Sequence, residues 1–228
     1  MGFNKLNRWL KSKLHNYDLV KLVKSKEWKI LPSDKICILA PHPDDETIGC
    51  GGLLFKYASQ CDIVLLTDGR GGGTLEEQEN LIEVRRKEFL RVMDYLKVNS
   101  FQILNAKDGW LVDSYDIFSK IDFEKYDYVL MPHEHDAHKD HIVVQAFFKR
   151  LCKENKKIKA KPVYYEIWAP IDMPNLYVDI SDVVEKKKEA INFYESQIKD
   201  IDYASRILGL NHYRGIRHHI AYEESYKI

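Results

Sequence analysis

The sequence has little that would tie the chain to nucleic acid, a disulfide framework or the membrane interior. Its 35 Lys+Arg balance 35 Asp+Glu over 228 residues, so no net charge attracts nucleic acid. The four cysteines are scattered without a C-x-x-C pair, which predicts reduced core thiols rather than disulfides or a zinc ribbon. No run of about 18 apolar residues occurs, and the first thirty residues lack the apolar centre of a signal peptide. We therefore expect a cytoplasmic protein without a membrane span.

The first thirty residues differ from the rest of the chain in charge. They hold eight Lys or Arg residues against Asp18 and Glu27. Their apolar residues recur at helical spacing, at Phe3, Leu6, Trp9, Leu10 and Leu14. The pattern predicts a basic helical extension over residues 1–30, before a single domain over residues 31–228. The extension could lie on an anionic membrane surface, but we favour packing on the domain with a solvated lysine face.

Beyond residue 30, short apolar strands alternate with helical patterns. Strands are expected at 35–40, 62–67, 101–104, 128–131, 162–168 and 176–180. Helices are expected at 47–59, 76–96, 114–121, 142–155 and 182–197, the last capped by Ser181 or Asp182. This alternation predicts a three-layer, Rossmann-like α/β fold, with a mostly parallel sheet and helices on both faces. In such sheets, ligands bind beyond the carboxyl ends of the strands.

Two dense groups of histidine and acidic residues each follow a predicted strand. Residues 42–46 read HPDDE, and residues 133–141 read HEHDAHKDH. Both groups should meet at one edge of the sheet, where clustered carboxylates would repel one another unless a cation is bound. Imidazole and carboxylate ligands suit zinc, iron or manganese, and three such ligands with one open position are typical of catalytic zinc. These residues alone leave any of four histidines eligible as the third ligand.

With these motifs the sequence resembles the PIG-L/LmbE-like metal-dependent N-deacetylase family. Its hallmark His-Pro-Asp-Asp-Glu segment corresponds to His42–Glu46, and its later His-x-Asp-His corresponds to His138–His141. Weaker matches stand in the expected order, at Asp68-Gly69, Arg85-Arg86, Asp108-Gly109, Tyr194–Gln197 and Tyr213–Gly215. The resemblance extends over residues 34–226.

The resemblance implies a role for each motif residue. The implied metal ligands are His42, Asp45 and His141. Asp44 is the implied general base, and a protonated His138 would stabilise the oxyanion or assist the leaving amine. Asp140 would orient His138 or the ligands. Some members carry a tyrosine five residues before the last ligand, where this chain has Asp136.

Substrate contacts are less well defined by the sequence. Asp108 could bind sugar hydroxyls or simply form an Asp-Gly turn. Arg70 and Arg214 could each bind a phosphate or carboxylate of the substrate, or form a structural ion pair. His133 and His135 could shape the pocket or belong to a solvated loop.

The resemblance implies a zinc-dependent hydrolase, or one using another divalent transition metal. It would remove the N-acetyl group from an amino sugar, as part of a GlcNAc-type glycan, a nucleotide sugar or a lipid-linked sugar. One alternative is another metal-dependent amidase, acting on a thiol conjugate or an acylated natural product. The other is a non-catalytic metal- or glycan-binding protein on the same fold. No nucleic-acid partner is expected, and the oligomeric state is left open.

Overall fold

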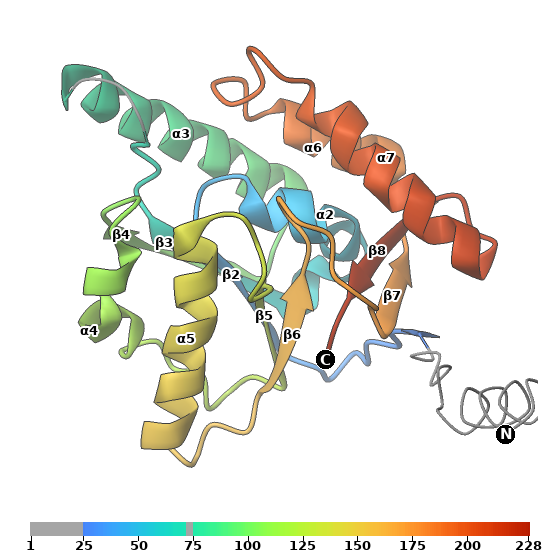
Figure 1. Cartoon of the computed structure of the whole chain (residues 1–228), viewed down its shortest axis with the longest axis horizontal. Coiled ribbons are helices and arrows are strands. Elements are labelled where there is room, and N and C mark those ends of the chain that lie inside the picture. The colour runs from blue at the N-terminus through green and yellow to red at the C-terminus, as the bar shows by residue number, and fades with distance from the viewer. Residues whose placement is uncertain (1–24, 72–74) are drawn as a thin grey trace, which may run out of the picture.

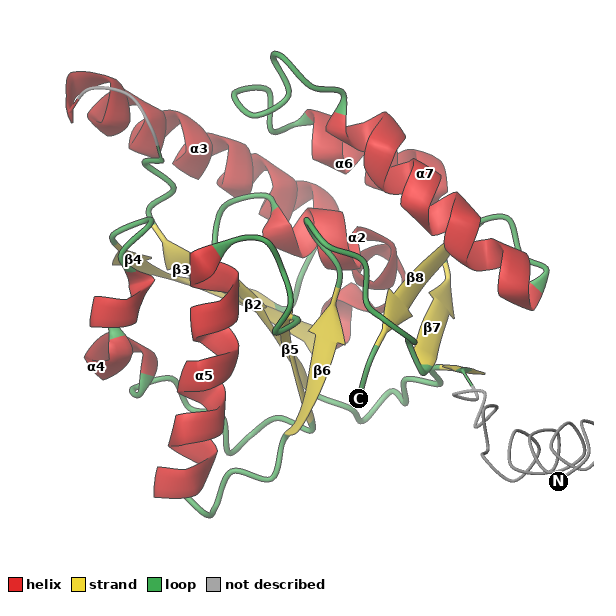
Figure 2. Cartoon of the chain, viewed as in Figure 1, coloured by secondary structure: helices red, strands yellow, loops and turns green. Residues whose placement is uncertain are grey.

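The computed structural model describes residues 25–71 and 75–228, so most of the predicted N-terminal helix lies outside the described residues. Five parallel strands form the central sheet in the order β4-β3-β2-β5-β6 (Figures 1 and 2). Their bounds are β2 (Ile36–Ala40), β3 (Cys61–Thr67), β4 (Ser100–Ala106), β5 (Tyr128–Pro132) and β6 (Lys161–Tyr165). This arrangement confirms the predicted α/β fold with a mostly parallel sheet.

Helices cover both faces of the sheet. They are α2 (Asp45–Tyr57), α3 (Leu75–Leu96), α4 (Tyr115–Phe118), α5 (Lys139–Glu154), α6 (Val184–Asn192) and α7 (Tyr203–Gly215). The central strand β2 divides its side chains between two cores because successive residues point to opposite faces. Ile36, Ile38 and Ala40 pack into the core that holds α2 and α3 residues. Cys37 and Leu39 pack into the core that holds α4 and α5 residues.

A second, three-stranded sheet lies beside the first in the order β1-β7-β8. It consists of β1 (Lys26–Glu27), β7 (Leu176–Asp179) and β8 (Glu223–Tyr226). Because β1 pairs with β7, and because Trp28 and Ile30 are buried in the core, residues 26–30 belong to the folded domain. The domain therefore begins before the predicted boundary at residue 31. Neither β8 nor α7 was predicted from the sequence.

The helix predicted over residues 182–197 is shorter in the structure. It begins at Val184 after an N-cap at Val183 that has no side-chain hydrogen bond, so neither Ser181 nor Asp182 caps it. The Ser181 hydroxyl instead donates to Asp179, and Asp182 pairs with Lys56. Because both side chains are engaged by these partners, neither is available to cap the helix.

A buried ion pair ties the C-terminal elements to α2. Lys187 of α6 is fully buried, and its Nζ donates to Glu224 Oε1 at 2.7 Å and to Asn211 Oδ1 at 3.0 Å. The Glu224 carboxylate also accepts the backbone N–H groups of Gly52 and Leu53 in α2. These contacts join α2, α6, α7 and β8. Removing either charged partner would leave the other as an uncompensated buried charge, which is strongly destabilising.

The cysteines were predicted to be reduced residues of the core. All four cysteines are free, and three of them are buried. Across residues 25–71 and 75–228, no helix has the length and apolar character needed to cross a bilayer.

Candidate metal centre

The two His/Asp groups meet where the strand order of the sheet reverses. Strand β2 has β3 on one side and β5 on the other, so the connections from β2 and β5 leave in opposite directions. Such a switch point opens a crevice at the carboxyl ends of the strands. His42 follows β2, while His141 lies in the first turn of α5 after β5. The predicted convergence at one sheet edge is confirmed.

Three buried ligand atoms form a nearly equilateral triangle in this crevice. His42 Nδ1 lies 3.2 Å from Asp45 Oδ2 and 3.3 Å from His141 Nε2. His141 Nε2 lies 3.2 Å from Asp45 Oδ2. Ligands about 2.0–2.1 Å from a tetrahedral zinc ion stand roughly 3.3–3.4 Å apart. The triangle therefore has the size of one face of a zinc coordination sphere.

The other ring nitrogen of each histidine faces carboxylates. His141 Nδ1 lies 2.8 Å from Asp136 Oδ1, which leaves its Nε2 lone pair facing the triangle. His42 Nε2 lies 3.1 Å from Asp108 Oδ1 and 3.4 Å from Asp140 Oδ2. Neither of these two contacts has hydrogen-bond direction, so His42 Nε2 is a buried polar atom without a partner. The His141 arrangement is the one that metal-bound histidines commonly adopt, with the second ring nitrogen hydrogen-bonded to a carboxylate.

The charge balance of the cluster also favours a cation. Burial lowers the pKa of His42, but the contacts with Asp108, Asp140 and Asp45 outweigh burial and raise it well above its usual value. Burial likewise opposes protonation of His141, yet Asp45 and Asp136 raise its pKa to about 9. The carboxylates therefore stabilise a positive charge at this point. A divalent metal ion would supply that charge, and the nitrogen and oxygen atoms present are suitable ligands for it. Two further groups of residues could also hold a metal ion. In each group the possible ligand atoms all lie within 4.8 Å of one another; the groups are His42–His138–His141 and His42–Asp108–Asp140.

Asp136 holds His141 in place from outside the triangle. Its carboxylate also accepts the backbone N–H groups of His138 at 3.1 Å and Trp168 at 3.0 Å. Burial raises the pKa of Asp136, but these bonds and His141 lower it overall. A charged, fully bonded Asp136 therefore keeps the His141 proton on Nδ1. The sequence singled out this residue only as a departure from the tyrosine of some family members.

Asp44 stands beside the triangle in an unusual backbone conformation. Its φ of 129° lies in a region that L-residues rarely adopt, where the chain passes from β2 into α2. Arg85 supports this turn by donating to the backbone oxygens of Pro43 and Gly69, and its Nη2 lies 3.5 Å from Asp44 Oδ2. Burial raises the pKa of Asp44 to about 8, although the Arg85 charge opposes the rise. The next acid, Glu46, is fully buried and accepts the Tyr194 hydroxyl at 2.5 Å.

His138 forms the N-cap of α5. Its Nδ1 accepts the backbone N–H of Asp140 at 3.3 Å, so a neutral ring carries its proton on Nε2. Burial lowers the pKa of His138, and the nearby His42 and His141 lower it further. The structure therefore favours a neutral Nε2–H donor over the protonated ring expected from the sequence.

Comparisons with known proteins agree with the motifs. The model of the family described as PIG-L, GlcNAc-PI de-N-acetylase, matches residues 37–152. The diacetylchitobiose deacetylase of Thermococcus kodakarensis is 32% identical over 194 residues, which are 73% of this chain and 71% of that protein. The chain belongs to the PIG-L family. The expected enzyme class, a deacetylase that hydrolyses an amide, is likewise confirmed by these relatives.

Solved structures show the PIG-L fold in proteins of different activity. The N,N'-diacetylchitobiose deacetylase of Pyrococcus horikoshii has a TM-score of 0.73 at 23% identity and covers 100% of this chain and 92% of its own. The 4-carboxy-2-hydroxymuconate hydratase GalB of Pseudomonas putida KT2440 has a TM-score of 0.63 at 18% identity. The match covers 85% of this chain and 96% of GalB. The fold alone therefore does not determine the reaction, which depends on the residues of the site.

The three residues predicted to contact substrate in this PIG-L chain do not lie together. Asp108 and Arg70 are on the side of the metal centre, whereas Arg214 lines another pocket. Asp108 lies in the site beside His42, whose contact lowers the pKa of Asp108 to about 2 although burial raises it. The partly exposed guanidinium of Arg70 pairs with Asp68 and interacts electrostatically with Asp108. Arg214 instead donates to Glu166 and the Ile171 carbonyl, and it lines a separate 240 Å³ pocket.

The two additional histidines of the second motif have no role as ligands of the triangle. His133 is buried, and its Nε2 lies 2.7 Å from the Ala169 carbonyl oxygen, so it links two loops. His135 is exposed on the loop, with 81% of its side chain accessible. His133 thus makes a contact between loops, whereas His135 faces solvent.

Proposed function

We propose that the protein is a zinc-dependent deacetylase that hydrolyses the N-acetyl group of an N-acetylated amino sugar, releasing acetate and a free amine. One observation carries the proposal: the zinc-sized triangle of His42, Asp45 and His141 stands beside the buried carboxylate of Asp44. The sugar class is carried over from the names of the family model and of the Thermococcus relative. Free, mostly buried thiols support a cytoplasmic location.

We assign the metal to His42 Nδ1, Asp45 Oδ2 and His141 Nε2. Two nitrogens and one oxygen at tetrahedral spacing support zinc over calcium or magnesium, which prefer oxygen ligands. When bound, zinc makes hydroxide available near neutral pH and polarises the acyl oxygen.

We assign proton transfer to Asp44. As a carboxylate it accepts a proton from the attacking water, whose oxygen forms the new bond to the acetyl carbon. It then returns the proton to the amide nitrogen, so that the C–N bond breaks and a neutral amine leaves. Burial raises the pKa of Asp44, which supports this role because a buried carboxylate accepts a proton more readily than one in water.

We assign the oxyanion contact to His138. Its Nε2–H can donate to the oxygen that gains negative charge during attack, because Nδ1 is occupied by the Asp140 backbone N–H. Asp140 therefore acts twice: its backbone sets the His138 tautomer, and its carboxylate faces His42. The Asp140 carboxylate is itself held by the Gly109 N–H at 2.7 Å.

We infer that sugar hydroxyls contact Asp108, with Arg70 at the rim of the same opening. The Asp108 carboxylate accepts the Gly71 N–H at 2.9 Å, which joins two loops at the carboxyl edge of the sheet. We place Arg214 outside this contact because it lines a separate pocket, where it donates to Glu166 and to the Ile171 carbonyl.

The test combines metal analysis with acetate release. Full-length protein loaded with one zinc equivalent should release acetate from N-acetylglucosamine, diacetylchitobiose or a nucleotide-linked N-acetylglucosamine. Asp44→Asn should keep its zinc and lose at least about a hundredfold in turnover. Asp94→Asn, at an exposed acid of α3, is the matched control and should remain fully active.

Three outcomes would contradict the assignment. A fully active Asp44→Asn would remove Asp44 as the base. Zinc-loaded protein that releases acetate only from thiol conjugates or acylated natural products would shift the substrate class, and release from no amide would indicate a binding protein.

A further inference from the structure

Positive charge is concentrated on the segment that links α5 to β6. Residues 149–161 contain seven Lys or Arg residues and one acid, in a chain whose net charge is zero. All seven cations are exposed. Within the described part of the chain, their one ion pair joins Arg150 to Glu154. The other six are lysines: Lys149, Lys153, Lys156, Lys157, Lys159 and Lys161.

This segment lies at the end of the sheet opposite the metal centre. Helix α5 begins at the carboxyl edge with His141 in its first turn, and runs back to the amino edge, where Lys153 lies in its last turn (Figure 1). At 1.5 Å per residue the two positions are about 18 Å apart along the helix. That distance exceeds the Debye length of about 8 Å at physiological salt, so the lysines do not act on the site chemistry.

The lysines border a groove with an apolar floor. Lys149, Lys153 and Lys159 line a 560 Å³ groove together with Phe148, Ile158, Pro162 and Tyr164. Unpaired like charges around one concave surface repel one another, and an anion entering there would relieve that repulsion. The aliphatic parts of the lysines and the apolar floor could accept the glycerol region of a lipid while the ammonium groups contact its phosphate.

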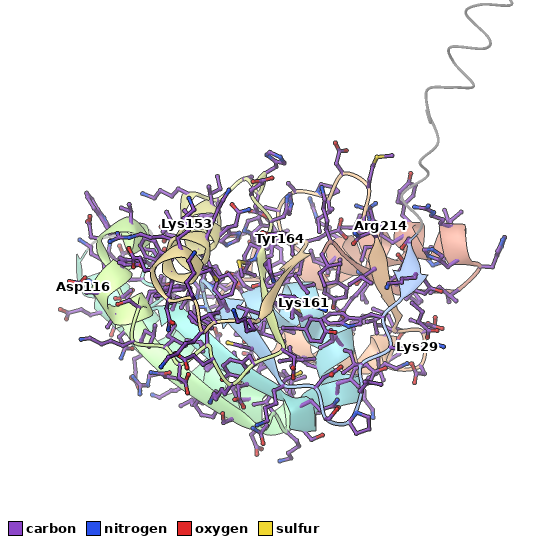
Figure 3. The ribbon with its side chains drawn as sticks, turned by 90° about the horizontal axis from the view of Figure 1, so that it is seen from below. Lys29, Asp116, Lys153, Lys161, Tyr164 and Arg214 are labelled. Carbon is purple, nitrogen blue, oxygen red and sulfur yellow. The ribbon has the colours of Figure 1, made fainter. Side chains whose placement is uncertain are left out.

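The basic surface continues towards the N-terminus. Lys161 lines a second, 440 Å³ groove with Lys26 and Lys29. Figure 3, viewed from below, shows Lys153, Lys161 and Lys29 spread across the same side of the molecule. We call Lys26, Lys29 and the seven cations of residues 149–161 the basic face. Residues 1–24, which precede Lys26 in the sequence, carry six Lys or Arg residues and one acid.

We propose that the basic face binds an anionic phospholipid surface, leaving the metal centre directed towards solution. Charge complementarity supports this occupant, because clustered lysines beside a bilayer attract acidic headgroups. The apolar groove floor and the apolar residues at helical spacing within residues 1–24 favour a bilayer over nucleic acid, whose backbone offers no apolar contact. The acids of the metal centre lie at the far edge, so an anionic surface also orients the molecule. The bound enzyme would thus take its substrate from solution rather than from within the bilayer.

The experiment is vesicle sedimentation with the full-length protein. Vesicles of 70% phosphatidylcholine and 30% phosphatidylserine should pellet the protein at low salt, and pure phosphatidylcholine should not. A fourfold variant replaces groove and neighbouring lysines by glutamine: Lys149→Gln, Lys153→Gln, Lys157→Gln and Lys159→Gln. Each lysine contributes a factor of roughly five, so binding should fall by at least about a hundredfold.

A matched variant removes the same charge elsewhere, at exposed lysines of α3, its C-terminus and α6: Lys87→Gln, Lys97→Gln, Lys186→Gln and Lys188→Gln. It should bind vesicles nearly as well as the unmodified protein. Equal thermal midpoints for both variants would show that each one folds. Brominated lipid should quench a fluorophore attached at Lys153→Cys but not one attached at Asp113→Cys, an exposed residue that follows β4.

Three results would overturn the proposal. These are failure to pellet with anionic vesicles, equal loss of binding in both fourfold variants, and retention of nucleic acid by the basic face in the absence of vesicle binding.

Discussion

Asp136 offers the sharpest test of the metal centre, because it touches no proposed ligand atom directly yet sets the His141 tautomer. In Asp136→Asn, the amide can place either oxygen or nitrogen towards His141 Nδ1. With nitrogen there, the His141 proton moves to Nε2 and blocks the lone pair that faces the triangle. With oxygen there, the amide nitrogen meets the Trp168 N–H, which loses its 3.0 Å bond. We therefore expect metal binding to weaken by about 10–100-fold.

The same change has a separate, smaller effect on stability. A buried donor left without a partner destabilises by about 1–3 kcal/mol, which is roughly 2–12 °C in the thermal midpoint for a domain of this size. Metal affinity is measured by competition with a chelating dye, and turnover by acetate release. Excess zinc should restore the turnover of Asp136→Asn. Glu134→Gln, on the same loop but exposed, is the control and should bind metal normally. Unchanged zinc affinity with lost turnover would refute the orienting role of Asp136.

Further predictions concern the scaffold. A Cβ on Gly49 would lie 2.2 Å from the Tyr165 ring, so Gly49→Ala should destabilise by about 1–3 kcal/mol in urea unfolding; equal stability would contradict this packing. Gly209 meets nothing within 4 Å, so Gly209→Ala should stabilise α7 by up to about 1 kcal/mol in the same assay. Lys187→Met leaves its buried carboxylate partner unpaired and should lower the unfolding free energy by about 3–5 kcal/mol. Burial raises the pKa of Asp62, but three hydrogen bonds lower it overall. The resulting stability is present above pH of about 3.9 and is lost as pH falls through the lowered pKa, so acid titrations of the wild type and Asp62→Ala should converge at low pH.

The fold was largely predictable because its pattern is local. Apolar strands such as β2 and β5 are buried on both faces and read as short apolar runs, while α3 and α5 repeat at helical spacing. The C-terminal part was less predictable. Strand β8 reads EESY, and it is buried because Glu224 meets Lys187 and two backbone N–H groups of α2. Such partners are more than thirty residues away in sequence, so no local pattern reveals them.

The sequence by itself determined that two His/Asp groups follow parallel strands and must therefore meet at one edge of the sheet. Family resemblance selected His141 among four candidate histidines and proposed Asp44 as base. Only the tertiary structure decided which atoms meet, since the 3.2–3.3 Å triangle joins residues 99 positions apart. It also showed that Asp136 contacts the outer nitrogen of His141 and that Arg214 donates to Glu166. Spacing along a chain sets which edge a residue reaches, whereas ring orientation and proton position depend on partners that folding alone brings together.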